Sequence, residues 1–227
     1  MLNVSKGDMY PWITHTWNTI KGECPHGCAY CYMRRFGKQR PVHFDAKELK
    51  TDLGEGNFIF VGSSCDMFAE AIPSEWIQNT LIRMTGQDNR YLLQTKNPAR
   101  IHRFAHDFFR RPMTICTTIE TNRIYPEIMG DTPTPFNRSA AMGLIGYPKY
   151  VTIEPIMDFD LAPLVKLVKR CEPEQVNIGA DSGGNGLPEP PADNVLTLIS
   201  ELKAFTRVKL KPNLKRLLPG NASLFED

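Results

Sequence analysis

The segment MTICTTIE, residues 113–120, has the pattern that decides the fold. Alternate residues of an extended chain point to opposite faces. One face is apolar apart from a threonine: Met113, Ile115, Thr117 and Ile119. The other face turns polar toward its end: Thr114, Cys116, Thr118 and Glu120. A strand buried in a parallel sheet is normally apolar on both faces. One apolar and one polar face favour a barrel with helices outside and a cavity inside.

Six other segments read as strands, and helical segments lie between them. The other predicted strands are residues 13–20, 58–63, 91–96, 150–156, 175–181 and 207–211. The predicted helices are residues 73–86, 97–109, 136–147, 161–171 and 192–205. This alternation predicts parallel strands joined by right-handed crossovers. We expect an α/β fold, an incomplete parallel βα TIM-like barrel of six to seven strands, with its site at the carboxyl ends of the strands. A doubly wound sheet is the alternative.

Composition indicates an ordinary globular protein. With 227 residues, 41% hydrophobic and 23% charged, we expect one domain spanning residues 1–227. A net charge of +2 is too small to argue for non-specific binding of nucleic acid. The sequence shows no apolar signal region and no run of eighteen apolar residues, so no membrane association is expected. Six cysteines without such a signal predict a cytoplasmic protein whose thiols serve metal or redox chemistry.

Three cysteines stand close together in GECPHGCAYCYMRR, residues 22–35, directly after the first predicted strand. Their spacing is C-x3-C-x2-C. A structural zinc site takes four ligands, so a non-catalytic zinc module would have to add His26 or Cys65. An iron–sulfur cluster with four irons and three cysteine ligands leaves one iron open to another molecule.

With an aromatic residue, Tyr30, before the last cysteine, the motif resembles the signature of the radical S-adenosylmethionine (SAM) enzymes. The fold of that superfamily is a partial βα barrel. The segments TWNTIKGECPHGCAYCY, FVGSSCDMFAEAIP, LLQTKNPARI, TTIETN, VTIEPIM and IGADSGG resemble, in that order, an uncharacterised and often phage-encoded radical SAM family. The chain is more distantly similar to the spore photoproduct lyases. The resemblance covers nearly the whole chain.

The resemblance implies that Cys24, Cys28 and Cys31 hold a 4Fe–4S cluster whose fourth iron binds SAM. One electron then cleaves SAM to a 5′-deoxyadenosyl radical, which takes a hydrogen atom from the substrate. Such chemistry implies a reducing partner such as flavodoxin or ferredoxin. A protein that keeps the cluster but only binds a partner is a further alternative.

Other candidate SAM or substrate contacts lie where strands end. Ser63, Ser64 and Asp66 stand where the superfamily often has a Gly-Gly-Glu run, from which this sequence departs; a simple N-capped turn is the alternative. Further candidates are Gln94, Lys96, Thr118, Glu120, Arg123, Glu154 and Asp181. For the strand-end charges the alternative is a set of internal salt bridges, such as Lys96 or Lys211 with Glu120 or Glu154.

Two cysteines outside the motif are candidate hydrogen donors, Cys116 and Cys65. The alternative for Cys116 is a small buried hydrophobe. Three basic stretches, residues 33–40, 100–111 and 209–216, would favour a nucleotide or nucleic-acid substrate if they surround the barrel mouth. A peptide or small metabolite remains open.

Overall fold

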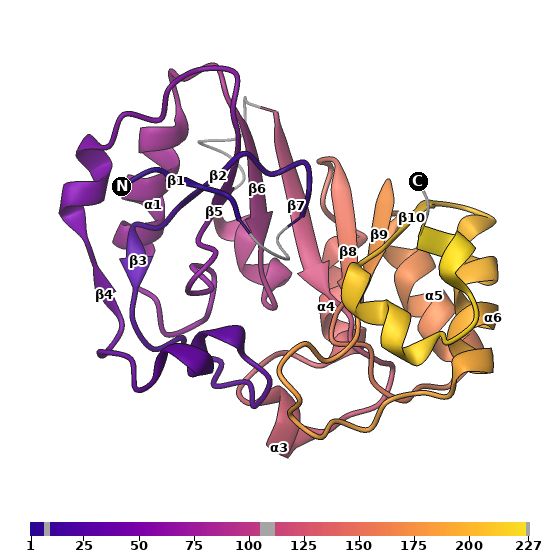
Figure 1. The fold of residues 1–227 in the computed structure, drawn as a ribbon. Helices are drawn as coiled ribbons and strands as arrows, with labels where there is room; N and C mark the ends of the chain where they lie inside the picture. The colour runs from indigo at the N-terminus through magenta and orange to yellow at the C-terminus, as the bar shows by residue number, and fades with distance from the viewer. Residues whose placement is uncertain (7–9, 105–111, 226–227) are drawn as a thin grey trace.

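A curved eight-stranded sheet forms the centre of the molecule (Figure 1). The computed structural model describes residues 1–6, 10–104 and 112–225. The strands are β1 (Asn3–Val4), β2 (His15–Trp17), β5 (Phe58–Val61), β6 (Arg90–Gln94), β7 (Met113–Thr118), β8 (Lys149–Ile153), β9 (Gln175–Ile178) and β10 (Arg207–Leu210). They lie side by side in that order. Every pair from β2 to β10 is parallel, and β1 is antiparallel to β2.

The strand order shows an incomplete barrel and excludes the doubly wound alternative. Each parallel strand is added beside its predecessor in the chain, always on the same side. A doubly wound sheet instead reverses its order at a switch point. In the described part of the chain β1 and β10 lie at the two ends of the order, so the barrel does not close. All seven predicted strands are confirmed; β1 was not expected.

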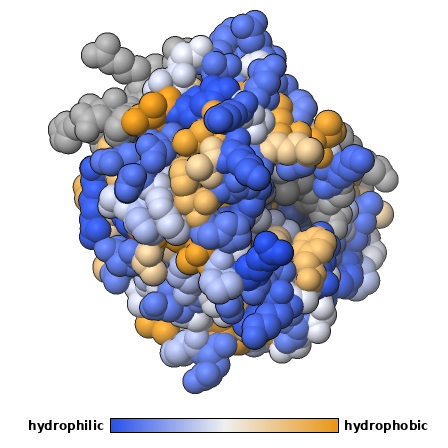
Figure 2. Space-filling view, turned by 90° about the vertical axis from the view of Figure 1, so that its left-hand side faces the viewer, coloured by the Kyte–Doolittle hydropathy of each residue, from blue (hydrophilic) through white to orange (hydrophobic). Residues whose placement is uncertain are grey.

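The helices cover the outside of the sheet (Figure 1). The α-helices are α1 (Ser74–Met84), α3 (Pro126–Met129), α4 (Pro135–Met142), α5 (Leu161–Cys171) and α6 (Ala192–Lys203). The 3-10 helices are η1 (Tyr32–Phe36), η2 (Ala46–Lys50), η3 (Pro98–Phe104), η4 (Pro212–Leu217) and η5 (Ala222–Phe225), and β3 (Ile20–Lys21) pairs with β4 (His43–Phe44). Within the described residues no helix is both long and apolar enough to cross a membrane. Hydrophilic residues predominate on the face in Figure 2.

One helix prediction gave the wrong type of helix. The segment 97–109 was expected to be an α-helix, but Pro98–Phe104 is a 3-10 helix, and residues 105–109 lie outside the described residues. The buried guanidinium of Arg100 donates to the backbone carbonyls of Ala69 and Ile72. These bonds hold the segment against the loop after β5, and they depend on tertiary contacts that helical periodicity does not reveal.

The alternation of side chains produces two separate cores. The helix side of the sheet carries residues such as Ile115, Val151 and Ile178 in the large outer core. The inner core comprises Tyr10, Ile13, Phe58, Phe60, Leu92, Cys116 and Tyr150, with Trp12 packed against it. The segment before β2 therefore fills the barrel interior, where the rings of Tyr10 and Trp12 stack with centroids 4.9 Å apart. This plug was not predicted.

The inner core predicts a large cost for truncating Leu92. Its side chain is fully buried, whereas Leu144 is 78% exposed. Leu92→Ala should lower the free energy of unfolding by about 2–5 kcal/mol through lost burial and a new cavity, while the matched Leu144→Ala should change it by less than about 0.5 kcal/mol. Urea denaturation measures both. Equal, small effects would contradict a packed barrel interior.

Candidate active site

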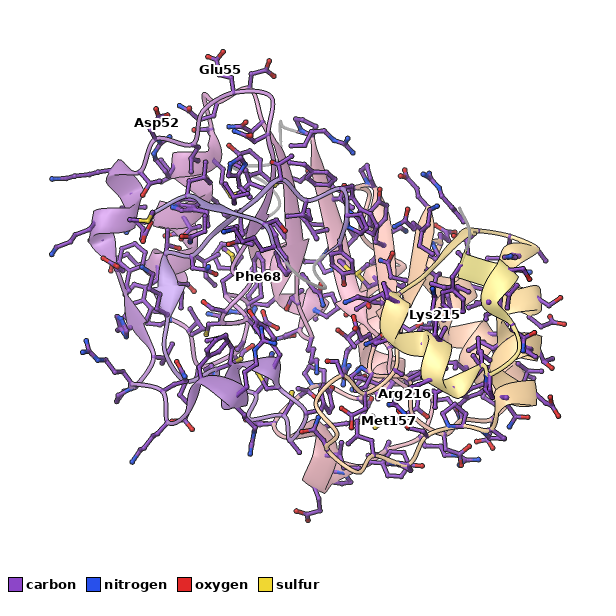
Figure 3. The ribbon with its side chains drawn as sticks, viewed as in Figure 1. Asp52, Glu55, Phe68, Met157, Lys215 and Arg216 are labelled. Atoms are coloured by element: carbon purple, nitrogen blue, oxygen red, sulfur yellow. The ribbon has the colours of Figure 1, made fainter. Side chains whose placement is uncertain are left out.

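A cavity of about 400 Å³ opens at the carboxyl ends of the strands, within the size range of ligand sites. The residues that line it include the predicted candidates Cys24, Cys28, Tyr30, Cys31, Ser63, Ser64, Cys65, Asp66, Gln94, Lys96, Thr118, Glu154 and Asp181. Asp52 and Glu55, labelled in Figure 3, lie toward the other end of the molecule. A larger groove of about 860 Å³ lies on the outer helices and contains none of these residues.

The three motif cysteines and Cys65 share this cavity as free thiols. A hydrogen bond with Cys65 lowers the pKa of Cys24 to about 6, although burial opposes this. Burial raises the pKa of Cys31. The ammonium of Lys96 lies 3.3 Å from the sulfur of Cys28. The cavity therefore stabilises negative charge on Cys24.

The donor set fits an iron–sulfur cluster better than zinc. No group of three or more His, Cys, Asp or Glu side chains among the described residues is placed to hold a metal ion. In a cubane cluster each thiolate binds a different iron, so the sulfurs stand farther apart than the ligands of one ion. His26 is not free to complete a zinc site, because Nδ1 bonds the carbonyl of Asp131 at 2.7 Å and Nε2 bonds Asp66 at 2.8 Å. The zinc alternative is therefore not favoured.

Asp66 fastens the cysteine loop to the strand ends. Its Oδ2 accepts from His26 Nε2, from Thr95 Oγ1 at 2.9 Å and from the backbone N–H of Lys96 at 2.7 Å. Its Oδ1 accepts from the N–H of Phe68 at 2.9 Å. Burial would raise the pKa of Asp66, but the hydrogen bond and charge of His26 outweigh it and lower the pKa. Four internal donors leave Asp66 better suited to bracing the loop than to binding a ligand.

The segment at α3 supports the cysteine loop from the other side. The N–H of Ala29 donates to the carbonyl of Ile128 at 2.9 Å, and the N–H of Asp131 donates to the carbonyl of His26 at 2.8 Å. Gly130, with φ of +66°, lies so close that a Cβ there would collide with the backbone of His26. The loop is therefore held by backbone contacts that require a glycine at residue 130.

Glu120 is paired inside the protein and does not line the cavity. It is fully buried, 2.7 Å from Arg138 and 3.0 Å from Lys96, and it also accepts from the hydroxyl of Tyr30. Lys96 in turn donates to that hydroxyl and lies 4.2 Å from the centroid of the Tyr30 ring. Burial would raise the pKa of Glu120, but Arg138 and Lys96 outweigh it and hold the pKa at about 2. Of the two interpretations of Glu120, the structure shows the internal salt bridge.

The serine turn after β5 is held by a residue that we did not predict. Asn18 bonds Ser63 Oγ at 3.2 Å and accepts from the N–H of Ser64 at 3.0 Å. The carbonyl of Ser63 accepts from the hydroxyl of Tyr32 at 2.7 Å. Within the described residues the hydroxyl of Ser64 has no hydrogen-bond partner. In this turn, the hydroxyl of Ser64 is thus the group that can still form a hydrogen bond with a ligand.

The remaining strand-end candidates differ in how many of their polar atoms already have partners within the protein. Gln94 accepts from Tyr10 at 3.0 Å and reaches Thr118 at 3.4 Å. Glu154 pairs with Lys211 at 2.8 Å, one of the salt bridges expected as an alternative. Asp181 accepts from two backbone N–H groups of its own loop. Gln94 and Thr118 keep the most capacity for a ligand inside the cavity.

Two further candidates, Arg123 and Cys116, lie outside the cavity. Arg123 pairs with Asp158 and Asp160 and does not line it. Cys116 is fully buried in the inner core, and burial raises its pKa. This position agrees with the alternative interpretation of Cys116, a small hydrophobic residue buried in the core. Cys65 does line the cavity, so it is the better placed of the two hydrogen-donor candidates.

The three basic stretches do not jointly surround the mouth. In the second, Arg100 is buried and Arg103 pairs with Glu70, and residues 105–111 lie outside the described part. In the third, Arg216, labelled in Figure 3, pairs with Glu189 on the loop after β9. Only the first stretch brings an arginine without an ion pair, Arg35, to the cavity in the described part of the chain.

Sequence reasoning missed Arg138 and Tyr10. Arg138 shares a helix face with the apolar Ala141 and Met142, and a cation at such a position predicts a buried acidic partner. Tyr10 precedes the first strand, where no periodic pattern marks a buried side chain.

Comparison with known proteins gives a fold but no family. No protein-family model matches the sequence, and no curated protein matches it. Spore photoproduct lyase complexed with dinucleoside spore photoproduct is similar in structure, with a TM-score of 0.65 and 11% identity over 91% of this chain and 78% of that one. A mutant of the lyase with bound AdoMet and the same dinucleoside gives 0.64 and 11% over 91% and 78%. The chain shares their fold.

Gly130→Ala should disturb the cysteine loop. An alanine at positive φ costs about 1–2 kcal/mol, and its Cβ would also push against the backbone of the loop. We expect a lower melting temperature and less iron bound after anaerobic reconstitution. Gly146→Ala is the control, because a Cβ there meets no atom within 4 Å. Unchanged iron binding in Gly130→Ala would contradict the bracing role.

Glu120→Gln should destabilise the protein by about 3–5 kcal/mol, because it leaves buried cations without their partner. A carboxyl whose pKa falls from 4.5 to about 2 on folding stabilises the fold fully above pH 4.5 and loses this effect as the pH falls toward 2. The stability difference from wild type, measured by urea denaturation, should therefore shrink over that window. Glu70→Gln, at an exposed salt bridge, should have little effect, and a pH-independent difference for Glu120→Gln would contradict the assignment.

Proposed function

We propose that the chain is a radical SAM enzyme that binds a 4Fe–4S cluster through Cys24, Cys28 and Cys31. The observation that carries the proposal is that these thiols, spaced C-x3-C-x2-C, line one cavity at the carboxyl ends of a partial barrel. When bound, the cluster and SAM supply a 5′-deoxyadenosyl radical for hydrogen abstraction. The shared fold with a lyase solved with bound AdoMet supports this assignment.

Different residues of the chain would bind different groups of SAM. Ser64 offers a hydroxyl acceptor for its ammonium group, and Gln94 and Thr118 offer hydrogen bonds to its ribose. Lys96, beside Cys28, would hold a positive charge near its carboxylate. Asp66 would act through the loop that it holds.

The substrate that we propose is a nucleotide or a nucleic-acid-related molecule. The support is that lyases with the same fold have been solved with a dinucleoside photoproduct.

The proposal is tested by anaerobic reconstitution with iron and sulfide, followed by SAM and dithionite. We expect a 4Fe–4S complement in the wild type and formation of 5′-deoxyadenosine, measured by chromatography. Cys28→Ala should lose both, because three thiolates are needed. Cys171→Ala is the matched control, since Cys171 is buried in the outer core and does not line the cavity. A protein that takes up zinc and builds no cluster would refute the proposal.

A further inference from the structure

A strip of positive charge begins directly after the last motif cysteine. The strip comprises Tyr32, Arg34, Arg35, Phe36, Lys38 and Arg40. Between Glu23 and Asp45 the chain contains no acidic residue at all. A surface of one charge sign attracts partners of the opposite sign and speeds their association.

The cations of the strip are available to a partner. Arg34, Arg35, Lys38 and Arg40 are all exposed, and no salt bridge among the described residues involves any of them. The guanidinium of Arg35 lies over two rings, 5.6 Å from the Tyr32 centroid and 4.9 Å from that of Phe36. Phe36 is 60% exposed. Exposed aromatic and arginine side chains are the types that dominate binding energy at protein interfaces.

The strip is physically joined to the thiol site. Arg34 donates to the carbonyls of Cys28 and Gly27 at 3.1 and 3.3 Å. Tyr32 and Arg35 line the same cavity as the three cysteines. A protein bound on the strip would therefore lie beside the thiols.

We propose that the strip docks a small acidic one-electron carrier protein. This inference rests on the proposed function, which consumes one electron per SAM cleaved. At this step the carrier is oxidised by one electron and the cluster is reduced by one, and no bond is made or broken. Electron-transfer interfaces are small, and charge complementarity guides their formation. A short cationic strip with exposed rings beside the cluster ligands matches both requirements.

A nucleic acid is the less favoured occupant of the strip. Binding to a phosphate backbone normally uses a series of free cations along a groove. Of the other cations that line the cavity, Lys211 pairs with Glu154 and Lys96 with Glu120, which leaves Lys6. Most of the cations without an ion pair near the cavity therefore lie in one short segment, residues 34–40.

The test compares two double charge reversals in the full-length, reconstituted protein. Lys38→Glu with Arg40→Glu reverses strip residues that do not line the cavity. Lys166→Glu with Lys169→Glu makes the same change in charge on α5, across the molecule from the cysteine segment in Figure 1. The probe is an acidic flavodoxin in its fully reduced form, and stopped-flow absorbance follows reduction of the cluster. Dithionite, a small reductant that needs no docking surface, is the parallel arm.

At low ionic strength the strip variant should be reduced by flavodoxin at least tenfold more slowly than wild type, and the α5 variant within twofold of it. Added salt should slow the wild type toward the strip variant. Dithionite should reduce all three proteins at similar rates and give the same yield of 5′-deoxyadenosine.

Equal slowing by both reversals, or by neither, would overturn the docking assignment. So would unchanged reduction by flavodoxin together with lost binding of a single-stranded oligonucleotide, which would assign the strip to phosphate. If wild type forms no 5′-deoxyadenosine with dithionite, the proposed function fails and the inference fails with it. That outcome appears in the dithionite arm alone and is distinct from a docking failure.

Discussion

The arrangement of the site depends on one buried carboxylate. Asp66 accepts hydrogen bonds from the cysteine loop through His26 and from the end of β6 through Thr95 and the N–H of Lys96. A buried charge without partners costs several kcal/mol, whereas one with a full set of donors fixes its neighbours in place. The loop that carries the thiols has little regular structure of its own. Its position relative to the barrel is therefore set by this carboxylate and by the backbone contacts at Gly130.

The strands and their faces could be predicted because burial repeats every two residues along each strand. The same reasoning located the cavity, since polar side chains gather where parallel strands end. What could not be predicted is which polar groups satisfy one another. Asp66 and Glu120 were expected as possible ligand contacts, and both turn out to be occupied internally. Their partners, His26 and Arg138, lie 40 and 18 residues away, a distance at which sequence pattern carries no pairing information. The plug at Tyr10 was missed for the same reason.

Internal pairing also decides what the cavity can bind. A carboxylate with four donors, such as Asp66, or with two cations and a hydroxyl, such as Glu120, has little left to offer a ligand. Removing such groups from the lining leaves a smaller set, in which Ser64 and Thr118 retain capacity and Lys96 stands beside Cys28. These groups surround the thiols on the inner side. The chemistry of the site is therefore confined to the space between the strand ends and the cysteine loop.

The outer side of the cysteine loop follows the opposite rule. Inside the barrel the charges are paired, as Lys211 is with Glu154 and Lys96 with Glu120. The exposed cations after Cys31 instead lie in a stretch of sequence, between Glu23 and Asp45, that contains no acidic residue. Paired interior charges hold a fixed cavity, and unpaired surface charges act at a distance on whatever approaches. Because Tyr32 and Arg35 line the same cavity as the thiols, a carrier bound to these surface cations would lie next to the groups that would hold the cluster.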